Sequence, residues 1–223
     1  MSIPILYEDN HLLVVEKPVN VPVQGDQSGD EDMHTLLKKD LKIRYQKPGN
    51  VYLGLVHRLD RPVGGVMVFA KTSKAASRLS DAVRRNAFTK TYMAVVRGIL
   101  SEKNKRLEHF LYKDRRENKV YAVSSNHKQA KKALLEYEVI GEKDSLCQLR
   151  INLITGRPHQ IRVQLAESGH PLYGDQKYGQ HVNKKGQQIA LWSHKLAFEH
   201  PTKKEMMEFT SNPPEASPWD MFQ

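Results

Sequence analysis

The chain has 223 residues, of which 39% are hydrophobic and 8% aromatic, as in ordinary globular proteins large enough to bury a core. Its 35 Lys and Arg residues exceed 25 Asp and Glu residues, and the net charge of +10 favours polyanionic partners such as nucleic acid. No apolar run approaches the roughly 20 residues that span a bilayer, and the N-terminus lacks a secretory pattern, so we expect a cytoplasmic protein without membrane association.

Cysteine usage agrees with that expectation. Cys147 is the only cysteine, so an intramolecular disulfide is excluded and a reducing compartment is suitable. Repeats and low-complexity tracts are absent, and we expect one domain over residues 1–223. No heptad pattern or apolar interface is evident, which favours a monomer.

The first half of the chain predicts short strands mixed with helices. Apolar runs predict strands at residues 5–7, 12–15, 51–56 and 65–70. Between the second and third strands, residues 24–32 have loop composition, and leucine spacing predicts an amphipathic helix that includes Leu36, Leu37, Leu41 and Ile43. A second helix is predicted over residues 73–86, and its basic face indicates either solvation or contact with phosphates.

The second half is richer in predicted strands, at residues 92–97, 133–140, 146–153 and 189–198. Residues 101–132 are strongly basic and poor in apolar side chains, which indicates an exposed hairpin or loop. A turn at residues 155–158 leads into a helix that continues through Ser168 and stops at Gly169.

The segment LVHRLDRPVGGVMVFAK, residues 55–71, places Asp60 between Arg58 and Arg61 in a connection between two apolar strands. Nearby cations lower a carboxylate pKa, so Asp60 is expected to act as an anion in nucleophilic or electrostatic work. The alternative is a turn aspartate that accepts backbone N–H groups, and spacing alone does not decide between them.

The segment TGRPHQIRVQLAESGHPLYGDQKYG, residues 155–179, gathers Arg157, His159 and Arg162 at a turn and the first turns of a helix. Because Ile161 and Arg162 are adjacent, we expect one to face the core or a ligand while the other points elsewhere. A basic helix end with a core isoleucine is an equally good interpretation.

Metal and nucleotide cofactors are not expected. His57, Asp60, His159, His170 and Asp175 are possible ligands, but the sequence has neither a His-x-x-x-His pair on one helix nor a Cys-x-x-Cys pair. It also lacks a phosphate-binding loop motif and a dinucleotide fingerprint.

Four segments in order resemble the RluA-type RNA pseudouridine synthases: ILYEDNHLLVVEKPVNVPV, HRLD, KTYMAVVRG and LITGRPHQIRVQLAESGHPLYGDQKYG. The resemblance covers nearly the whole chain. It implies an α+β pseudouridine synthase catalytic fold, with a mixed, largely antiparallel central sheet flanked by helices and a cleft across the sheet.

The resemblance also implies roles for individual residues. Asp60 would be the catalytic aspartate and Arg162 its salt-bridge partner, while Tyr92 would pack against the target base. In full, the expected catalytic residues are Asp60, Arg162 and Tyr92, and the expected substrate-binding residues are Arg58, Ile161, His57, Arg157 and His159. Of these, Ile161 would hold the other side of the base and Arg58 would enter the RNA stack that the base has left.

The sequence departs from the family pattern in two places. An acidic residue, Thr and Ser commonly follow HRLD, whereas this chain has Arg61, Pro62 and Val63, which puts loop contacts and substrate choice in doubt more than chemistry. Many relatives also begin with a small RNA-binding domain, whereas the catalytic opening starts here at residue 5. We therefore expect RNA to be held by the catalytic domain's own basic surface, including residues 101–132.

The chemistry agrees with a single carboxylate. Isomerising uridine to pseudouridine breaks the bond from C1′ to N1 and rejoins the base through C5, so no second carboxylate is needed to deliver water. The base must be flipped out of its stack, and the reaction needs no cofactor. We expect an isomerase that acts on a stem-loop uridine of ribosomal or transfer RNA. The alternatives are a noncatalytic RNA-binding or RNA-folding protein on the same scaffold and, more remotely, a metal-dependent nuclease.

Overall fold

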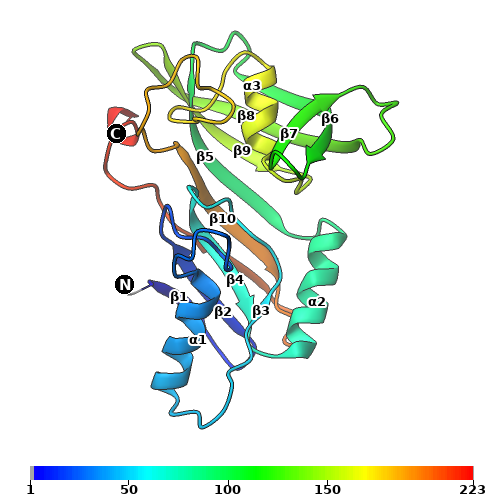
Figure 1. Ribbon diagram of the computed structural model, residues 1–223, viewed down its shortest axis with the longest axis vertical. Helices are drawn as coiled ribbons and strands as arrows, with labels where there is room; N and C mark the ends of the chain where they lie inside the picture. Colours follow the sequence, from blue (N-terminus) through cyan, green and yellow to red (C-terminus); the bar gives the residue numbers. More distant parts are fainter. Residues whose placement is uncertain (1–2, 223) are drawn as a thin grey trace. The chain divides into compact units, whose positions relative to one another are not determined.

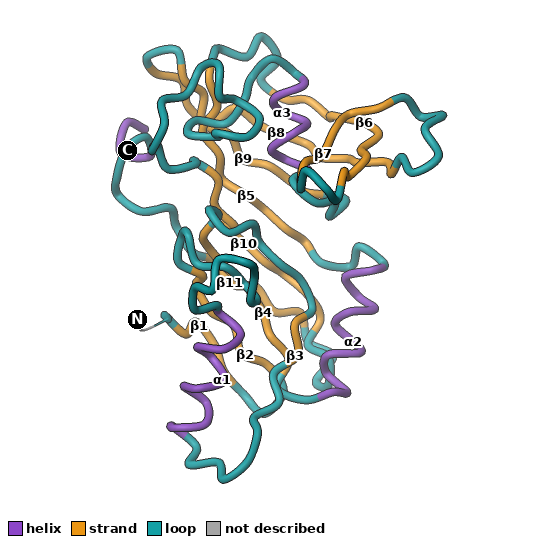
Figure 2. Tube along the Cα trace, viewed as in Figure 1, coloured by secondary structure: helices purple, strands orange, loops and turns teal. Residues whose placement is uncertain are grey.

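The computed structural model describes residues 3–222 and divides into two compact units (Figure 1). Unit 1 comprises the described chain up to Thr89 together with Ser193–Asn212. Unit 2 comprises Lys90–Trp192 and the chain from Pro213 onward. Figure 2 shows that each unit combines strands with helices, as expected for an α+β protein.

Unit 1 is built on four paired strands, with a fifth and a sixth added at their sides. Its elements are β1 (Ile5–Glu8), β2 (Leu12–Lys17), α1 (Met33–Arg44), β3 (Gly54–Leu55), β4 (Gly64–Ala70), α2 (Ser73–Arg84), the part of β10 (Leu191–Glu199) from Ser193 onward, and β11 (Met206–Thr210). The strand order is β1-β2-β4-β10, while β3 pairs with β4 and β11 with β10. Four of these strand pairs are antiparallel: β1 with β2, β2 with β4, β3 with β4, and β10 with β11.

The core of unit 1 is centred on β4. All seven residues of this strand, GGVMVFA, are buried, which explains why it is apolar throughout instead of alternating. Val66 and Val68 pack in one cluster with Leu79 of α2. Helix α2 begins at the N-cap residue Thr72, whose hydroxyl accepts the N–H of Ala75.

Unit 2 is a sheet of five antiparallel strands in the order β5-β9-β8-β6-β7. Its elements are β5 (Thr89–Arg97), β6 (Asn104–Asp114), β7 (Lys119–Val123), β8 (Lys131–Lys143), β9 (Leu146–Leu153), α3 (Gln160–Glu167) and the short 3-10 helix η1 (Trp219–Phe222). Val163 of α3 packs against Leu111, Val120 and Ala133 on one face of this sheet.

Most predicted elements are confirmed, and the exceptions are short or irregular. The strand predicted over residues 51–56 pairs only at Gly54–Leu55, although Val51 and Leu53 are buried. In α1, Leu37 and Leu41 face the core, but Ile43 is 76% exposed because it lies off that face. The hairpin of β6 and β7 agrees with the hairpin or loop predicted over residues 101–132, whereas β11 was not predicted.

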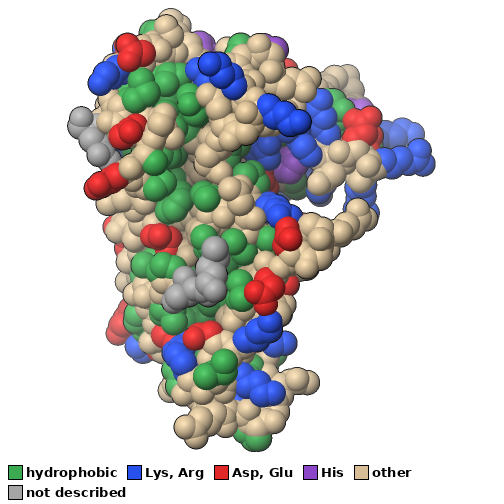
Figure 3. Space-filling model, turned by 60° about the vertical axis from the view of Figure 1, so that its left-hand side comes forward, with side chains coloured by type: hydrophobic (Ala, Val, Ile, Leu, Met, Phe, Trp, Pro, Cys, Tyr) green, Lys and Arg blue, Asp and Glu red, His purple; other side chains and the backbone are tan. Residues whose placement is uncertain are grey.

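Charge is spread over the surface. On the face drawn in Figure 3, Lys and Arg side chains are interspersed with Asp and Glu side chains. Several cations of the hairpin are exposed at the turn between β6 and β7: Lys113, Arg115, Arg116. No helix within residues 3–222 is long and apolar enough to cross a membrane.

Candidate active site

The predicted site residues are divided between the two units. Unit 1 holds His57, Arg58 and Asp60, in the segment that leads into β4. Unit 2 holds the remaining predicted residues, which lie on β5 and around the start of α3: Tyr92, Arg157, His159, Ile161 and Arg162.

The turn that carries Asp60 is fixed through its backbone. The N–H of Val63 donates to the carbonyl oxygen of Asp60 at 3.0 Å, which closes the turn. The ammonium group of Lys17, at the end of β2, donates to the carbonyl oxygens of Arg61 at 2.9 Å and Val63 at 2.7 Å. A third bond goes to Pro18 at 2.9 Å.

Lys17 is therefore a structural anchor of the turn that carries Asp60. Its side chain is fully buried, and burial lowers the pKa of its ammonium group to about 7, although the negative charge of Asp60 opposes that decrease. The sequence predicts only a strand at residues 12–15 in this region. The signal that could have identified the anchor is a lysine within an otherwise buried apolar strand.

Gly65, just after the turn, is required by close packing. Its φ of +114° is rarely adopted by residues with a side chain, and a Cβ there would lie 2.2 Å from the carbonyl oxygen of Ser193. Because β10 approaches this backbone so closely, the start of β4 has little freedom to shift. The turn that carries Asp60 is thus connected to a tightly packed strand.

The two residues before the turn have different environments. His57 accepts the N–H of Val68 at its Nε2, with a distance of 3.1 Å, so this nitrogen is engaged by β4. Arg58 is exposed and makes no ion pair within the described part of the chain. Its guanidinium group is thus available to a ligand.

Arg61, the first residue that departs from the family pattern, is engaged by an acidic loop. Its guanidinium group donates to the Ser28 hydroxyl at 3.0 Å and to the Asn20 carbonyl oxygen at 3.2 Å. It also pairs with Asp30 and lies 3.6 Å from Asp26. The loop that precedes α1 therefore covers and neutralises a cation next to Asp60 in sequence.

The turn before α3 is held by a buried glutamine. The side-chain oxygen of Gln160 accepts the Thr155 hydroxyl at 2.8 Å and the N–H of Arg157 at 2.9 Å. The Arg157 side chain donates to the carbonyl oxygen of Lys132 at 2.9 Å. His159 occupies the N-cap position with a φ of 52° and gives the helix no side-chain cap. These contacts fix the start of α3, which carries Ile161 and Arg162.

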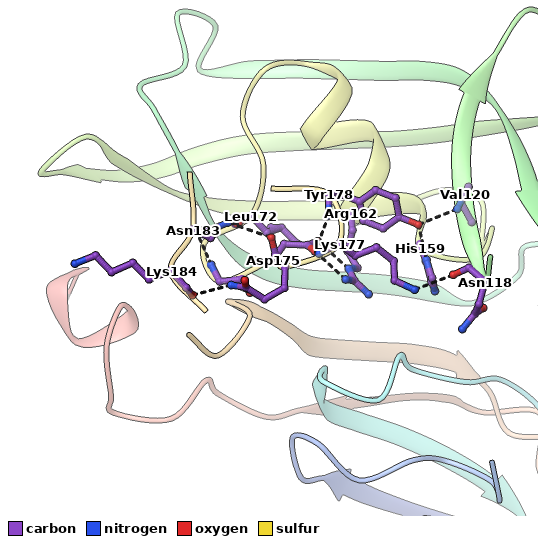
Figure 4. Close-up of polar contacts among 12 residues, drawn as sticks. Asn118, Val120, His159, Arg162, Leu172, Asp175, Lys177, Tyr178, Asn183 and Lys184 are labelled. Atoms are coloured by element: carbon purple, nitrogen blue, oxygen red, sulfur yellow. Dashed lines mark hydrogen bonds and ion pairs between the residues drawn. The ribbon is translucent and has the colours of Figure 1, made fainter. Parts of the chain in front are cut away.

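Arg162 forms a two-pronged ion pair with Asp175 (Figure 4). Its Nε and one terminal nitrogen each lie 2.8 Å from a different oxygen of that carboxylate. Both residues are buried, with 8% and 1% of their surfaces exposed. The N–H groups of Lys177 and Tyr178 also donate to the Asp175 carboxylate. Arg162 is thereby held in one orientation.

The environment of Asp175 keeps it ionised. Burial by itself raises a carboxyl pKa, but the hydrogen bond and positive charge of Arg162, with the two backbone N–H groups, hold the pKa of Asp175 below its ordinary value. A neutral Asp175 would remove a buried negative charge that compensates the Arg162 guanidinium. The pair is therefore a stable charged unit at neutral pH.

Tyr178 links the same segment to His159 and to the hairpin. Its hydroxyl accepts the N–H of Val120 in β7 at 2.9 Å and lies 2.6 Å from Nδ1 of His159 (Figure 4). Lys177 donates to the carbonyl oxygen of Asn118 at 2.8 Å, in the turn between β6 and β7. Residues 175–178 thus contact Arg162, His159 and the hairpin together.

The two predicted base-holding residues are both buried side chains of unit 2. Tyr92 is 8% exposed on β5, where it pairs with Ile151 of β9. Ile161 is 4% exposed at the start of α3. Arg162, the next residue, is buried too, and Asp175 neutralises its charge.

Sequence reasoning missed Lys17, Asp175 and Tyr178 as parts of the site. The last two lie in the segment GDQKYG, where the sequence indicates Asp175 only as a possible metal ligand. Among residues 3–222, no group of three His, Cys, Asp or Glu side chains is arranged to hold a metal ion.

Comparison with known proteins identifies the class. The family model for RNA pseudouridylate synthase matches residues 11–167. Among solved structures, human RNA Pseudouridylate Synthase Domain Containing 1 superposes with a TM-score of 0.78 at 23% identity, covering 99% of this chain and 87% of that one. This likeness confirms the pseudouridine synthase fold.

Relatives found by sequence similarity belong to the same family as the matching model. An uncharacterized RNA pseudouridine synthase of Aquifex aeolicus is 34% identical over 96% of this chain and 71% of its own length. Ribosomal large subunit pseudouridine synthase D of Haemophilus influenzae is 33% identical over 92% of this chain, and synthase C of Buchnera aphidicola is 32% identical over 88%. The chain spans 65% and 63% of the lengths of these two. The chain therefore belongs to the RNA pseudouridine synthase family, whose members are isomerases.

Proposed function

We propose that this protein converts a uridine in a stem-loop of ribosomal or transfer RNA to pseudouridine, with Asp60 as the anion that acts at the sugar. The family match over residues 11–167 carries this proposal. The turn that holds Asp60 supports it, because Lys17 and Gly65 restrict its movement. A catalytic group must be held close to its productive position to be effective.

The reaction begins with removal of the target base from its stack, at a cost of a few kcal/mol. Arg58 enters the space that the base leaves, and its exposure without an ion pair supports this role. Tyr92 and Ile161 then contact the two sides of the base.

Asp60 acts on the ribose while the bond from C1′ to N1 breaks. The base turns and its C5 bonds to C1′, after which C5 loses its proton and N1 gains one. Because no other atom is gained or lost, the reaction requires no water, redox partner or cofactor. By the family resemblance Arg162 would be the ion-pair partner of Asp60, and Asp175 fixes the direction of that guanidinium.

Exposed cations bind the RNA backbone. The turn between β6 and β7 presents Lys113, Arg115 and Arg116 to solvent, which supports contact with phosphates. His57, Arg157 and His159 complete the substrate-binding set. We expect the protein to act as a monomer in the cytoplasm, where its single buried cysteine stays reduced.

The test is a comparison of wild-type and Asp60→Ala proteins on pooled, unmodified ribosomal and transfer RNA transcripts, without added metal or cofactor. Pseudouridine is mapped by carbodiimide-dependent reverse-transcription stops. We expect stops at one or a few uridines with the wild type and none with the variant. Equal stops with both proteins would contradict the role of Asp60, and RNA binding without any stops would favour the noncatalytic RNA-binding alternative.

A further inference from the structure

We propose that Lys90 is a binding residue for an RNA phosphate, kept without a protein partner so that the substrate supplies the counter-charge. This inference rests on the proposed function. It adds to the site a residue that neither the sequence motifs nor the reaction scheme assigns.

The first observation is that Lys90 is an exception among buried cations. Three Lys and Arg side chains in the described chain are buried: Lys17, Lys90 and Arg162. Lys17 donates to three carbonyl oxygens and Arg162 is paired with Asp175. Lys90 is 9% exposed and has neither a hydrogen bond nor an ion pair within residues 3–222.

An unpaired buried ammonium group is unfavourable, because its charge has lost water without gaining a partner. Burial accordingly lowers the pKa of Lys90, and no neighbouring charge opposes the decrease. An anionic ligand would provide the missing partner. For a protein of this family, the anion at hand is the phosphodiester group of the RNA.

The second observation is that the ammonium group is accessible beside the late motif. Every fully buried side-chain polar atom in the described chain has a hydrogen-bond partner, so the unpartnered Nζ of Lys90 must retain some contact with solvent. A Cβ placed on the exposed Gly156 would lie 3.2 Å from that Nζ. The missing side chain of Gly156 therefore leaves space next to the ammonium group.

The third observation is the position of Lys90 relative to Tyr92 along β5. Lys90 and Tyr92 are two residues apart on one strand, so their side chains point to the same face, about 7 Å apart along the strand. Tyr92 is the proposed contact of the target base. This spacing is comparable to the separation between a base and the phosphate of its own nucleotide, so one flipped nucleotide could contact both residues.

The test compares Lys90→Met with Lys143→Met, a matched variant that removes one exposed and unpaired cation. Both are made in an Asp60→Asn background so that RNA is not converted during the binding measurement. The ligand is a stem-loop RNA that the wild type modifies. Its Kd is measured over a range of salt concentrations, and the melting temperature of each protein is measured without RNA.

We expect Lys90→Met to weaken RNA binding about tenfold, because one charge-assisted hydrogen bond is lost. The slope of the logarithm of the binding constant against the logarithm of salt concentration should decrease in magnitude by about one. Its melting temperature should rise by about 2–4 °C, because an apolar side chain replaces an unpaired charge. Lys143→Met should change the RNA affinity, the salt dependence and the melting temperature by much less.

A residue with only a structural role would lower the melting temperature when replaced, and that result would overturn the proposal. So would a Kd for Lys90→Met within twofold of that for Lys143→Met. If the wild type modifies no RNA, the proposed function itself fails, a result distinct from failure of the Lys90 assignment.

Discussion

The catalytic turn at residues 60–63 and the late motif at residues 155–179 are held in different ways. The turn is fixed through main-chain groups: Lys17 reaches the carbonyl oxygens of Arg61 and Val63. The late motif is fixed mainly through side chains, by the ion pair of Arg162 with Asp175 and the hydroxyl of Tyr178.

This difference indicates what each region tolerates. Contacts to carbonyl oxygens do not depend on the side chains of the turn, so residues 61–63 can depart from the family pattern without disturbing the position of Asp60. The late motif has no such freedom, because its geometry depends on the identity of Asp175 and Tyr178. Substitutions in the late motif should therefore affect stability and activity more than substitutions of residues 61–63 do.

The largest effect is expected from Asp175→Asn. The change removes the carboxylate that forms the two-pronged ion pair with the buried Arg162 guanidinium, which should lower the free energy of unfolding by about 3–5 kcal/mol. The isomerisation rate should fall further than RNA affinity, because Arg162 loses its fixed orientation. Asp9→Asn is the control, since Asp9 accepts hydrogen bonds from Tyr7 and His200, outside the proposed site. Equal rate losses in both variants would indicate general destabilisation.

Lys17→Met should have the next largest effect. Three carbonyl oxygens lose a donor, while removal of a buried charge offsets part of that loss, so we expect destabilisation of about 2 kcal/mol. Urea unfolding measures this value, and single-turnover kinetics should show a slower rate because the turn is looser. A stable variant with the wild-type rate would show that Gly65 and β4 alone hold the turn.

The two regions should also respond to pH in different ranges. The pKa of Asp175 is lowered in the folded protein, so its stabilisation is present above its ordinary value near 3.8 and is lost as pH falls through the lower folded value. The pKa of Lys17 is lowered to about 7 from 10.5, so the unfolded state binds more protons between these values. Its contribution to the free energy of unfolding therefore increases from pH 7 toward 10.5.

Unfolding curves of the wild type, Asp175→Asn and Lys17→Met at several pH values test this division. The decrease in the free energy of unfolding at acid pH should be smaller in Asp175→Asn than in the wild type. The increase in the free energy of unfolding at alkaline pH should be smaller in Lys17→Met. If both variants kept the wild-type pH profile, the assignment of these two groups would be wrong.

The smallest effect is expected from Arg61→Ala. Arg61 is 41% exposed at its side chain, as are its partners Asp26 and Asp30 at 43% and 54%, so the ion pairs should contribute at most about 1 kcal/mol. The rate on a good substrate should change less than threefold. A large loss of rate would show that the acidic loop, and not the turn alone, positions Asp60.

Much of the fold could be predicted because its signals are local. Strand β4 is buried on both faces and is therefore apolar throughout. Strand β9 is buried mainly on one face, so its apolar and polar residues alternate. The strand predicted over residues 51–56 is shortened to the two residues of β3, and the late strand β11 was missed because it carries no distinctive pattern. The site was harder to predict because its supporting contacts join residues far apart in sequence, as Lys17 does with Val63.

The resemblance named the residues of the site, but it did not say what holds them. Asp175 was considered only as a metal ligand, because a lone aspartate near glycines gives no sign of an arginine thirteen positions earlier. The partner of Arg61 also could not be read from the sequence, although the acidic composition of residues 24–32 was evident.

The most direct test of the central claim is a single-turnover comparison of wild-type and Asp60→Asn proteins on one stem-loop substrate, with RNA Kd measured in parallel. Asn is nearly isosteric with Asp but carries no negative charge. We predict that the variant binds RNA within about threefold of the wild type and forms no detectable pseudouridine, because only the carboxylate can act at the sugar. Pseudouridine formation at the wild-type rate by Asp60→Asn would contradict the account.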